Sequence, residues 1–180
     1  DEFSDAEITP GGNNQENTTA TSEDTRLKLR IGFNSINTIR RQLLITEDSN
    51  ATQGVDWGYD GMIQESQIDD MFWLINNQRF TIQGIDVIDN QTILPIGVYT
   101  DSDGTNSFAL DALTNATAIT KVYLHDKVLN IYHNLSEQNY GIFLPAGEYL
   151  ERFEITFSNQ NTLNISNKNH IDNLDVHYSS

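Results

Sequence analysis

The sequence predicts an all-β fold, more specifically an antiparallel β-sandwich of jelly-roll type built as a single domain with a flexible N-terminal segment. Three observations lead to this prediction. Short apolar stretches alternate with polar residues, turn-forming Asn, Asp and Gly separate them roughly every 8–12 residues, and no stretch shows a sustained helical period. With 180 residues, the chain is long enough for one well-packed core.

The first strand is predicted over residues 26–33, where apolar and polar side chains alternate with a period of two. The apolar positions are Leu27, Leu29, Ile31 and Phe33. Residues 1–25 contain few large apolar side chains and several turn-forming pairs, which is typical of a linker or a disordered loop. We therefore expect the folded module to span residues 26–158.

The next strands are predicted at three short apolar stretches bounded by Asn, Asp and Gly, over 42–46, 79–82 and 92–99. Residues 101–104, Asp-Ser-Asp-Gly, favour a tight turn because Asp and Gly tolerate positive φ angles. This turn predicts a hairpin between residues 98–99 and 108–110.

Four more strands are expected in the second half of the chain, at 122–124, 129–132, 140–144 and 152–157. The Pro-Ala-Gly sequence at 145–147 predicts the turn of another hairpin. The only helical turn that we expect lies around residues 66–71. Residues 159–170 are rich in Asn, Ser and Thr and predict a second linker, and 171–178 predict one further strand.

The charge of the chain excludes some partners. Ten basic and 26 acidic residues give a net charge of −16, which repels nucleic acids and anionic membrane surfaces. No apolar run reaches the ~18 residues that span a bilayer, so we expect no direct membrane insertion. Residues 1–12 lack the apolar stretch of a signal peptide, and we interpret the chain as a processed or excised piece. Without cysteine, it has neither disulfides nor thiolate metal sites.

A dense group of acidic residues, interrupted by glycines, runs from residue 47 to residue 70. Carboxylates on bent loops suit Ca²⁺, which takes six to eight oxygen ligands, so calcium is a candidate cofactor. The alternative is a solvated acidic loop, and for residues 101–106 an ordinary Asx turn. The candidate metal ligands are Glu47, Asp48, Asp56, Asp60, Asp69, Asp70, Asp101 and Asp103.

We find no catalytic pattern and predict that the chain is not an enzyme. Asp69 and Asp70 are adjacent, so on a strand they point to opposite faces and cannot flank one glycosidic bond. The four histidines show no metal-binding spacing, and neither a Gly-x-Ser-x-Gly motif nor a phosphate-binding loop occurs.

Four aromatic residues lie near the acidic loop: Trp57, Tyr59, Phe72 and Trp73. A flat aromatic ring beside carboxylates and amides is typical of sugar-binding sites, while core packing is the alternative. Phe72 and Trp73 stand in an apolar run, so at least one of them belongs to the core. Trp57 and Tyr59 are the candidate ligand-binding residues.

Several pieces of the chain, in consistent order over 26–157, resemble a known module. They are Gln-Leu-Leu at 42–44, residues 51–61, Ile-Gln-Gly at 82–84, 94–97, Tyr-Leu-His-Asp-Lys at 123–127, and 146–157 with its Arg-Phe-Glu sequence. This pattern is similar to the β-sandwich module that precedes the C-terminal sorting domain in Bacteroidetes proteins exported by the type IX secretion system. Residues 171–180 resemble the start of that sorting domain, truncated here.

The resemblance implies a secreted or outer-membrane surface protein, of the adhesin or gliding-motility type, with the type IX channel and its accessory proteins as partners. It implies no catalytic residue. We therefore expect a non-catalytic extracellular structural or interaction module. The alternative is a carbohydrate-binding or adhesive module, assisted by calcium, with a glycan as its partner. An exposed Trp57 beside a concave surface would favour the alternative.

Overall fold

The computed structural model describes residues 23–116, 119 and 121–159, which form strands and loops without a helix. The predicted all-β class is confirmed. The predicted linker over 1–25, apart from its last three residues, lies outside the described residues, as do the second linker beyond Asn159 and the strand at 171–178. The strands are β1 (Lys28–Asn34), β2 (Arg40–Glu47), β3 (Gly61–Met62), β4 (Asp70–Ile75), β5 (Gln78–Ile85), β6 (Ile93–Thr100), β7 (Gly104–Thr114), β8 (Tyr123–Asp126), β9 (Ile131–Asn134), β10 (Tyr140–Leu144) and β11 (Gly147–Thr156).

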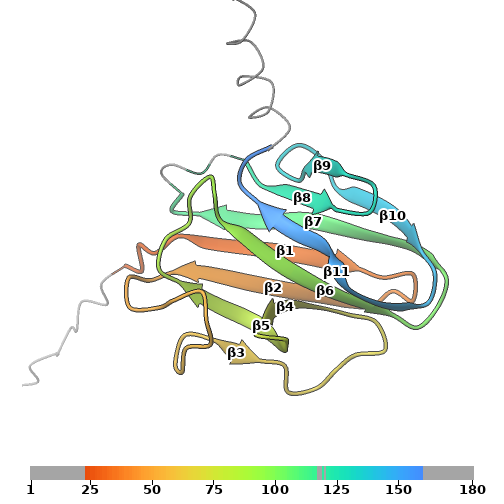
Figure 1. The fold of residues 1–180 in the computed structure, drawn as a ribbon, viewed down its shortest axis with the longest axis horizontal. Coiled ribbons are helices and arrows are strands. Elements are labelled where there is room, and N and C mark those ends of the chain that lie inside the picture. The colour runs from red at the N-terminus through yellow and green to blue at the C-terminus, as the bar shows by residue number, and fades with distance from the viewer. Residues whose placement is uncertain (1–22, 117–118, 120, 160–180) are drawn as a thin grey trace, which may run out of the picture.

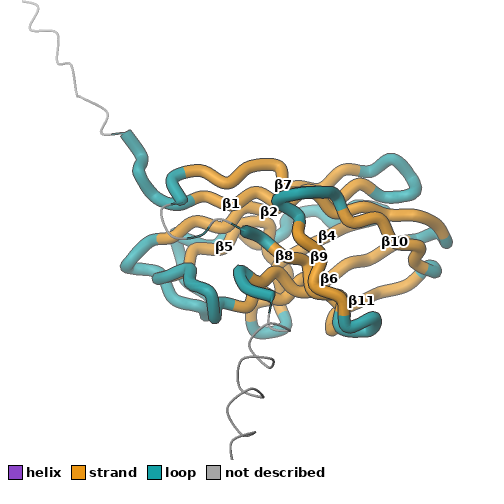
Figure 2. Tube along the Cα trace, turned by 90° about the horizontal axis from the view of Figure 1, so that it is seen from above, coloured by secondary structure: helices purple, strands orange, loops and turns teal. Residues whose placement is uncertain are grey.

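All described strands belong to one hydrogen-bonded sheet, which folds over so that its two halves face each other. The strand order is β10-β7-β1-β2-β5-β4-β6-β11-β8-β9, and β3 pairs with β5. Figure 2 shows the resulting layers, with β1, β2 and β7 on one side and β6 and β11 on the other. The pairing is antiparallel except between β2 and β5, where Leu44 lies beside Ile82 in a parallel register.

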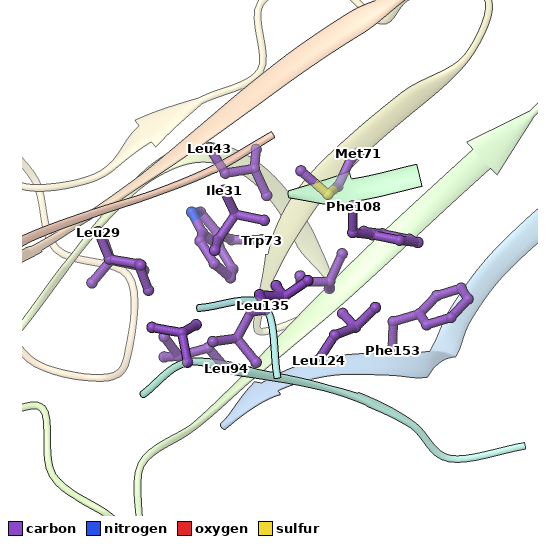
Figure 3. Packing of buried hydrophobic residues seen from close by; sticks show 14 of the residues in the cluster. Leu29, Ile31, Leu43, Met71, Trp73, Leu94, Phe108, Leu124, Leu135 and Phe153 are labelled. Atoms are coloured by element: carbon purple, nitrogen blue, oxygen red, sulfur yellow. The ribbon is translucent and has the colours of Figure 1, made fainter. Parts of the chain in front are cut away.

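The core lies between the two halves and consists of buried apolar side chains from β1, β2, β4 to β8, β10 and β11 and from some of the loops between strands (Figure 3). On β1 these are Leu29, Ile31 and Phe33, all fully buried, as the alternation predicts. β4 is buried on both of its faces. Trp73 packs in the core and donates its indole N–H to the Leu44 carbonyl at 3.1 Å, whereas Phe72 lies on the opposite face beneath the Arg79 guanidinium, at 4.5 Å.

The predicted hairpin between β6 and β7 is wrong, although the turn at 101–104 exists. β6 pairs with β4 and β11, whereas β7 pairs with β1 and β10. The turn is therefore a corner at which the chain changes layers (Figure 1). At this corner Thr100 pairs with Gly147 in one layer, and Gly104 pairs with Leu144 in the other.

The hairpin predicted at 145–147 is wrong for the same reason, because β10 pairs with β7 while β11 pairs with β6 and β8. The two corners lie side by side, and the Ala146 N–H donates to Asp103 Oδ1 at 2.7 Å. The neighbouring segments therefore form a two-stranded ribbon, in which the pair β6 and β11 continues into the pair β7 and β10 and the ribbon bends at the corners. Each half of the ribbon then contributes its apolar face to the same core.

Two smaller predictions also fail. Residues 66–69 form a loop with a bend at 68–69 rather than a helical turn, and β4 begins directly after them. β9 begins at Ile131 instead of residue 129, because the Asp126 carboxylate accepts the N–H groups of Val128 and Leu129 at 3.1 and 3.2 Å and holds them in a turn. The described residues contain no helix that is long and apolar enough to cross a membrane.

Candidate functional site

The connection between β2 and β3, residues 48–60, is held in shape by two of the predicted acidic residues. Asp56 Oδ2 accepts hydrogen bonds from the N–H of Thr52 at 2.5 Å and from its hydroxyl at 2.8 Å. Asp60 Oδ2 accepts the N–H of Asp56 at 2.6 Å. Asp and Thr side chains that bond the backbone in this way stabilise turns. The loop is therefore ordered by its own side chains.

The same loop is fastened to β5 through Gly84. The Gly84 N–H donates to Asp60 Oδ1 at 2.9 Å, and the loop approaches the glycine so closely that a Cβ there would lie 2.7 Å from the Tyr59 Cβ. Ala51 packs against the same position and is buried. The Ala-to-Gly sequence at 51–61 and the Ile-Gln-Gly sequence at 82–84 are therefore spatial neighbours, which their separation in the chain conceals.

Trp57 stands at the tip of this loop with 94% of its surface exposed. Gly58 follows it with φ of +91°, a conformation that glycine adopts without strain, and this turn lets the chain return to β3. Beside Trp57 is a hollow of about 80 Å³ between the loop and the start of β5. It is lined by Val55, Asp56, Trp57, Asp60, Met62, Gln78 and Phe80.

Tyr59, the second predicted ligand-binding residue, lies elsewhere. It is half-buried and lines a separate depression with Arg26, on the side of the loop that faces Gly84. Phe72 and Trp73 are fully buried, so neither presents a ring to solvent. Of the four aromatic residues near the acidic loop, Trp57 is the one whose side chain is almost wholly exposed to solvent.

The remaining predicted acidic residues are distributed over distant parts of the fold. Glu47 and Asp48 lie at the end of β2, in a polar hollow of about 660 Å³ that also contains Arg26. Hydrogen bonds from Asn50 and the nearby Arg26 guanidinium hold the pKa of Asp48 below its usual value. Glu47 Oε2 accepts the N–H of Ile88 at 3.3 Å.

Asp69 and Asp101 meet at the other end of the sheet. Asp69 is fully buried, and its Oδ1 accepts the Asp101 N–H at 2.8 Å and the Asn37 amide at 3.3 Å. Burial acts to raise the pKa of Asp69, but the hydroxyl of Ser35 and these donors outweigh it, so the pKa lies below the usual value.

Asp70 and Asp103 also bind donors within the chain. Asp70 Oδ1 and Oδ2 accept the Nε–H and Nη2–H of Arg41 at 2.5 and 2.9 Å in a bidentate ion pair, whereas Asp103 holds the Ala146 N–H of the second corner. No three His, Asp or Glu side chains gather in a metal-binding group within residues 23–116, 119 and 121–159. The calcium hypothesis stays a prediction, and the eight acidic residues do not form one site.

A second polar cluster, not predicted from the sequence, connects β8, β10 and β11. Asp126 is 1% exposed and accepts the Nε–H and Nη2–H of Arg152 at 3.0 and 2.8 Å. The Tyr140 hydroxyl donates to the same carboxylate at 3.1 Å. Because β8 and β10 lie near opposite ends of the strand order, this clasp of Asp126, Arg152 and Tyr140 links the two edges of the folded sheet.

The clasp continues in a partly buried hydrogen bond between His125 Nδ1 and Glu154 Oε1 at 2.8 Å, with the ring of Tyr132 stacked on the imidazole at 3.9 Å. His125 pairs with Glu154, and Asp126 with Phe153, in the antiparallel register of β8 and β11. The Tyr-Leu-His-Asp-Lys and Arg-Phe-Glu sequences are thus cross-strand partners. Their common role in this fold is structural.

The fold and the loop around Trp57 define a class of protein, namely an all-β domain that presents one exposed indole on a loop fixed to the sheet. Residues 12–157 match the family model described as a domain of unknown function, DUF8693, and the chain belongs to this family. Neither a curated protein nor a solved structure matches the chain.

Proposed function

We propose that this domain is a non-catalytic extracellular binding module that holds carbohydrate through Trp57. The observation that carries the proposal is the 94% exposure of an indole ring on a loop whose other parts are fixed by hydrogen bonds. A ligand that stacks on this ring does not have to order the loop, so little conformational entropy is lost on binding.

Single exposed apolar side chains are common on protein surfaces and by themselves indicate nothing. Trp57 differs in its setting, because the hollow beside it combines apolar side chains with an amide and carboxylates. The apolar face of a sugar ring packs on an indole, while the hydroxyl groups at the ring's edge need hydrogen-bonding partners. The Gln78 amide and the Asp56 carboxylate line the same hollow as Trp57 and can supply such partners.

The carbohydrate-binding function is favoured over that of an inert spacer because the fold gives a structural reason for the other distinctive residues near Trp57. Asp56 and Asp60 shape the loop, and Gly84 admits it to the surface of β5. Trp57 is not required by this packing, since its ring is almost wholly in solvent. A bound ligand would explain why a tryptophan occupies this position.

The cellular setting belongs to the same proposal and is supported by the resemblance and by the acidic composition. We place the domain in a secreted or outer-membrane surface protein that leaves the cell through the type IX channel. Deleting residues 26–157 and measuring secretion of the parent protein tests a role of the domain in export. Unaltered secretion would remove that role and leave the carbohydrate site unaffected.

The binding function is tested by retention of the purified domain on a panel of immobilised polysaccharides. Trp57→Ala is expected to lose at least tenfold in retention while its melting temperature stays unchanged, because the ring makes few contacts in the folded state. Phe143→Ala is the matched control, since Phe143 is an aromatic side chain 60% exposed on β10. Equal retention of the wild type and both variants would contradict the proposal.

A further inference from the structure

We infer that the ligand at Trp57 is an uncharged polysaccharide, bound along the chain rather than at its end. This inference rests on the proposed carbohydrate-binding function and specifies its ligand. Two properties of the site carry it: the charges around the hollow, and the shape of the hollow itself.

The charged groups that line the hollow are carboxylates. Asp56 and Asp60 contribute two, and no Lys or Arg is among the lining residues. The whole chain carries a net charge of −16, so an approaching uronate or sulfate group is repelled at long range as well as at the site. A sugar whose polar groups are hydroxyls pays no such penalty, because a hydroxyl can donate to a carboxylate.

The basic side chains near the loop are already paired. Arg26, which lies on the far side of Asp60, forms ion pairs with Asp24 at 2.8 Å and with Asp48 at 3.4 Å. Arg79, next to Gln78 in the chain, forms an ion pair with Glu148 at 2.5 Å. The charge of each guanidinium is therefore already compensated by a carboxylate of the protein, which weakens its attraction for an acidic sugar.

The shape of the hollow indicates binding along a chain. Pockets that enclose a small ligand have volumes of roughly 300–1,000 Å³, whereas this hollow has about 80 Å³. It can take a substituent such as a hydroxymethyl group but not a whole sugar ring. The ring must instead lie on the indole of Trp57, which is 94% exposed, so the hollow does not enclose the sugar and neighbouring sugars can continue beyond it.

The test compares retention of the wild type, Trp57→Ala and Phe143→Ala on two sets of immobilised polymers. The neutral set is a β-glucan, a mannan and a xylan, and the acidic set is alginate and polygalacturonate. We expect Trp57-dependent retention, at least tenfold above that of Trp57→Ala, on a neutral polymer and on neither acidic one. Trp57-dependent retention on an acidic polymer would overturn the inference while supporting the binding function. Its absence on every polymer would overturn both.

A variant with an added positive charge tests directly whether the charge around the hollow selects an uncharged polysaccharide. Gln78→Lys adds a cation at the rim of the hollow and is expected to create retention on polygalacturonate at low salt. Thr105→Lys adds the same charge at an exposed position on β7, outside the hollow, and is expected to create none. If the two variants behave alike, charge at the hollow does not select the ligand and the inference fails.

Competition with soluble sugars tests the mode of binding. Hexasaccharides of the neutral polymer that is bound should displace the domain at concentrations at least tenfold below those of the monosaccharide. Equal displacement per mole by the monosaccharide would show that one sugar suffices, and would overturn binding along the chain.

Discussion

Replacing Asp126 with Asn should destabilise the domain more than any change at a surface ion pair. Asn has nearly the same size, and its amide oxygen can still accept the N–H groups of the turn at 128–129. The change removes the negative charge that faces the Arg152 guanidinium, whose side chain is only 13% exposed. The result is an unpaired cation inside the protein.

The expected cost follows from this burial. Removing one partner of a buried ion pair destabilises a protein by about 3–5 kcal/mol. The total free energy of unfolding of a protein is about 5–15 kcal/mol. Glu148→Gln on β11, the strand that carries Arg152, is the matched control, because its ion pair with Arg79 is exposed and such pairs contribute at most about 1 kcal/mol. With a urea m-value of about 2 kcal/mol/M, the Asp126→Asn midpoint should fall by about 2 M.

Urea unfolding at pH 7, followed by fluorescence, measures both variants. A double variant, Asp126→Asn with Arg152→Met, removes the unpaired charge as well and should regain part of the lost stability. If Asp126→Asn and Glu148→Gln unfold at the same urea concentration, the clasp of Asp126, Arg152 and Tyr140 does not hold the edges of the sheet together.

Asp126→Asn should also change how the stability of the domain depends on pH in acid. Burial acts to raise the pKa of Asp126, but the hydrogen bonds and the charge of Arg152 outweigh it and lower the pKa in the folded state. In the unfolded chain the pKa is about 3.9. The stabilisation is therefore present above that value and disappears as pH falls through the lower folded pKa. Asp126→Asn should show a smaller loss of stability than the wild type does as the pH falls below about 3.9.

Three further predictions test other parts of the structure. Gly84→Ala should cost about 1–3 kcal/mol and weaken polysaccharide retention, because the added methyl displaces the loop, whereas Gly141→Ala, with open space around it, should change neither. Burial and the Asp126 charge raise the pKa of Tyr140 to about 12, so stability should fall as pH rises from about 10 towards 12, and Tyr140→Phe should show a smaller fall in urea unfolding. Acrylamide should quench Trp57 but not the buried Trp73, so Trp57→Phe should leave a blue-shifted, weakly quenched spectrum; unchanged quenching would contradict the exposed position of Trp57.

The strands could be predicted because their pattern is local. Side chains on a strand point alternately to its two faces, so a strand with one face in the core shows its period within a few residues. β1 illustrates this, since Leu29, Ile31 and Phe33 alternate with half-buried or small residues. β4 shows the limit of the argument, because it is covered on both faces and its apolar run has no alternation.

The pairing of the strands could not be predicted from the turns. Asp101 to Gly104 bend the chain as their residue types require, yet the strands on either side join different layers. Local turn chemistry determines that the chain changes direction. Whether the two strands then pair or separate depends on which arrangement buries their apolar faces, and that involves the distant strands β4, β10 and β11.

The candidate site shows the same division. The residues on either side of Trp57 in the sequence singled it out as a candidate for exposure, and the structure places its side chain in solvent. Closeness in sequence was misleading for the acidic residues, because Asp69 lies beside Asp101 and far from Asp56 in the fold. The residues that complete the hollow, Gln78 and Phe80, carry no signal of their own in the sequence.

By itself the sequence determined the all-β class, the positions of most strands, the acidic surface and the absence of disulfides, because these depend on composition or on neighbours along the chain. Only the tertiary structure decided the strand order, the clasp between β8, β10 and β11, and the separation of Trp57 from Tyr59. Each of these brings together groups that are distant in sequence, and they meet because one continuous sheet must fold over to bury its apolar face.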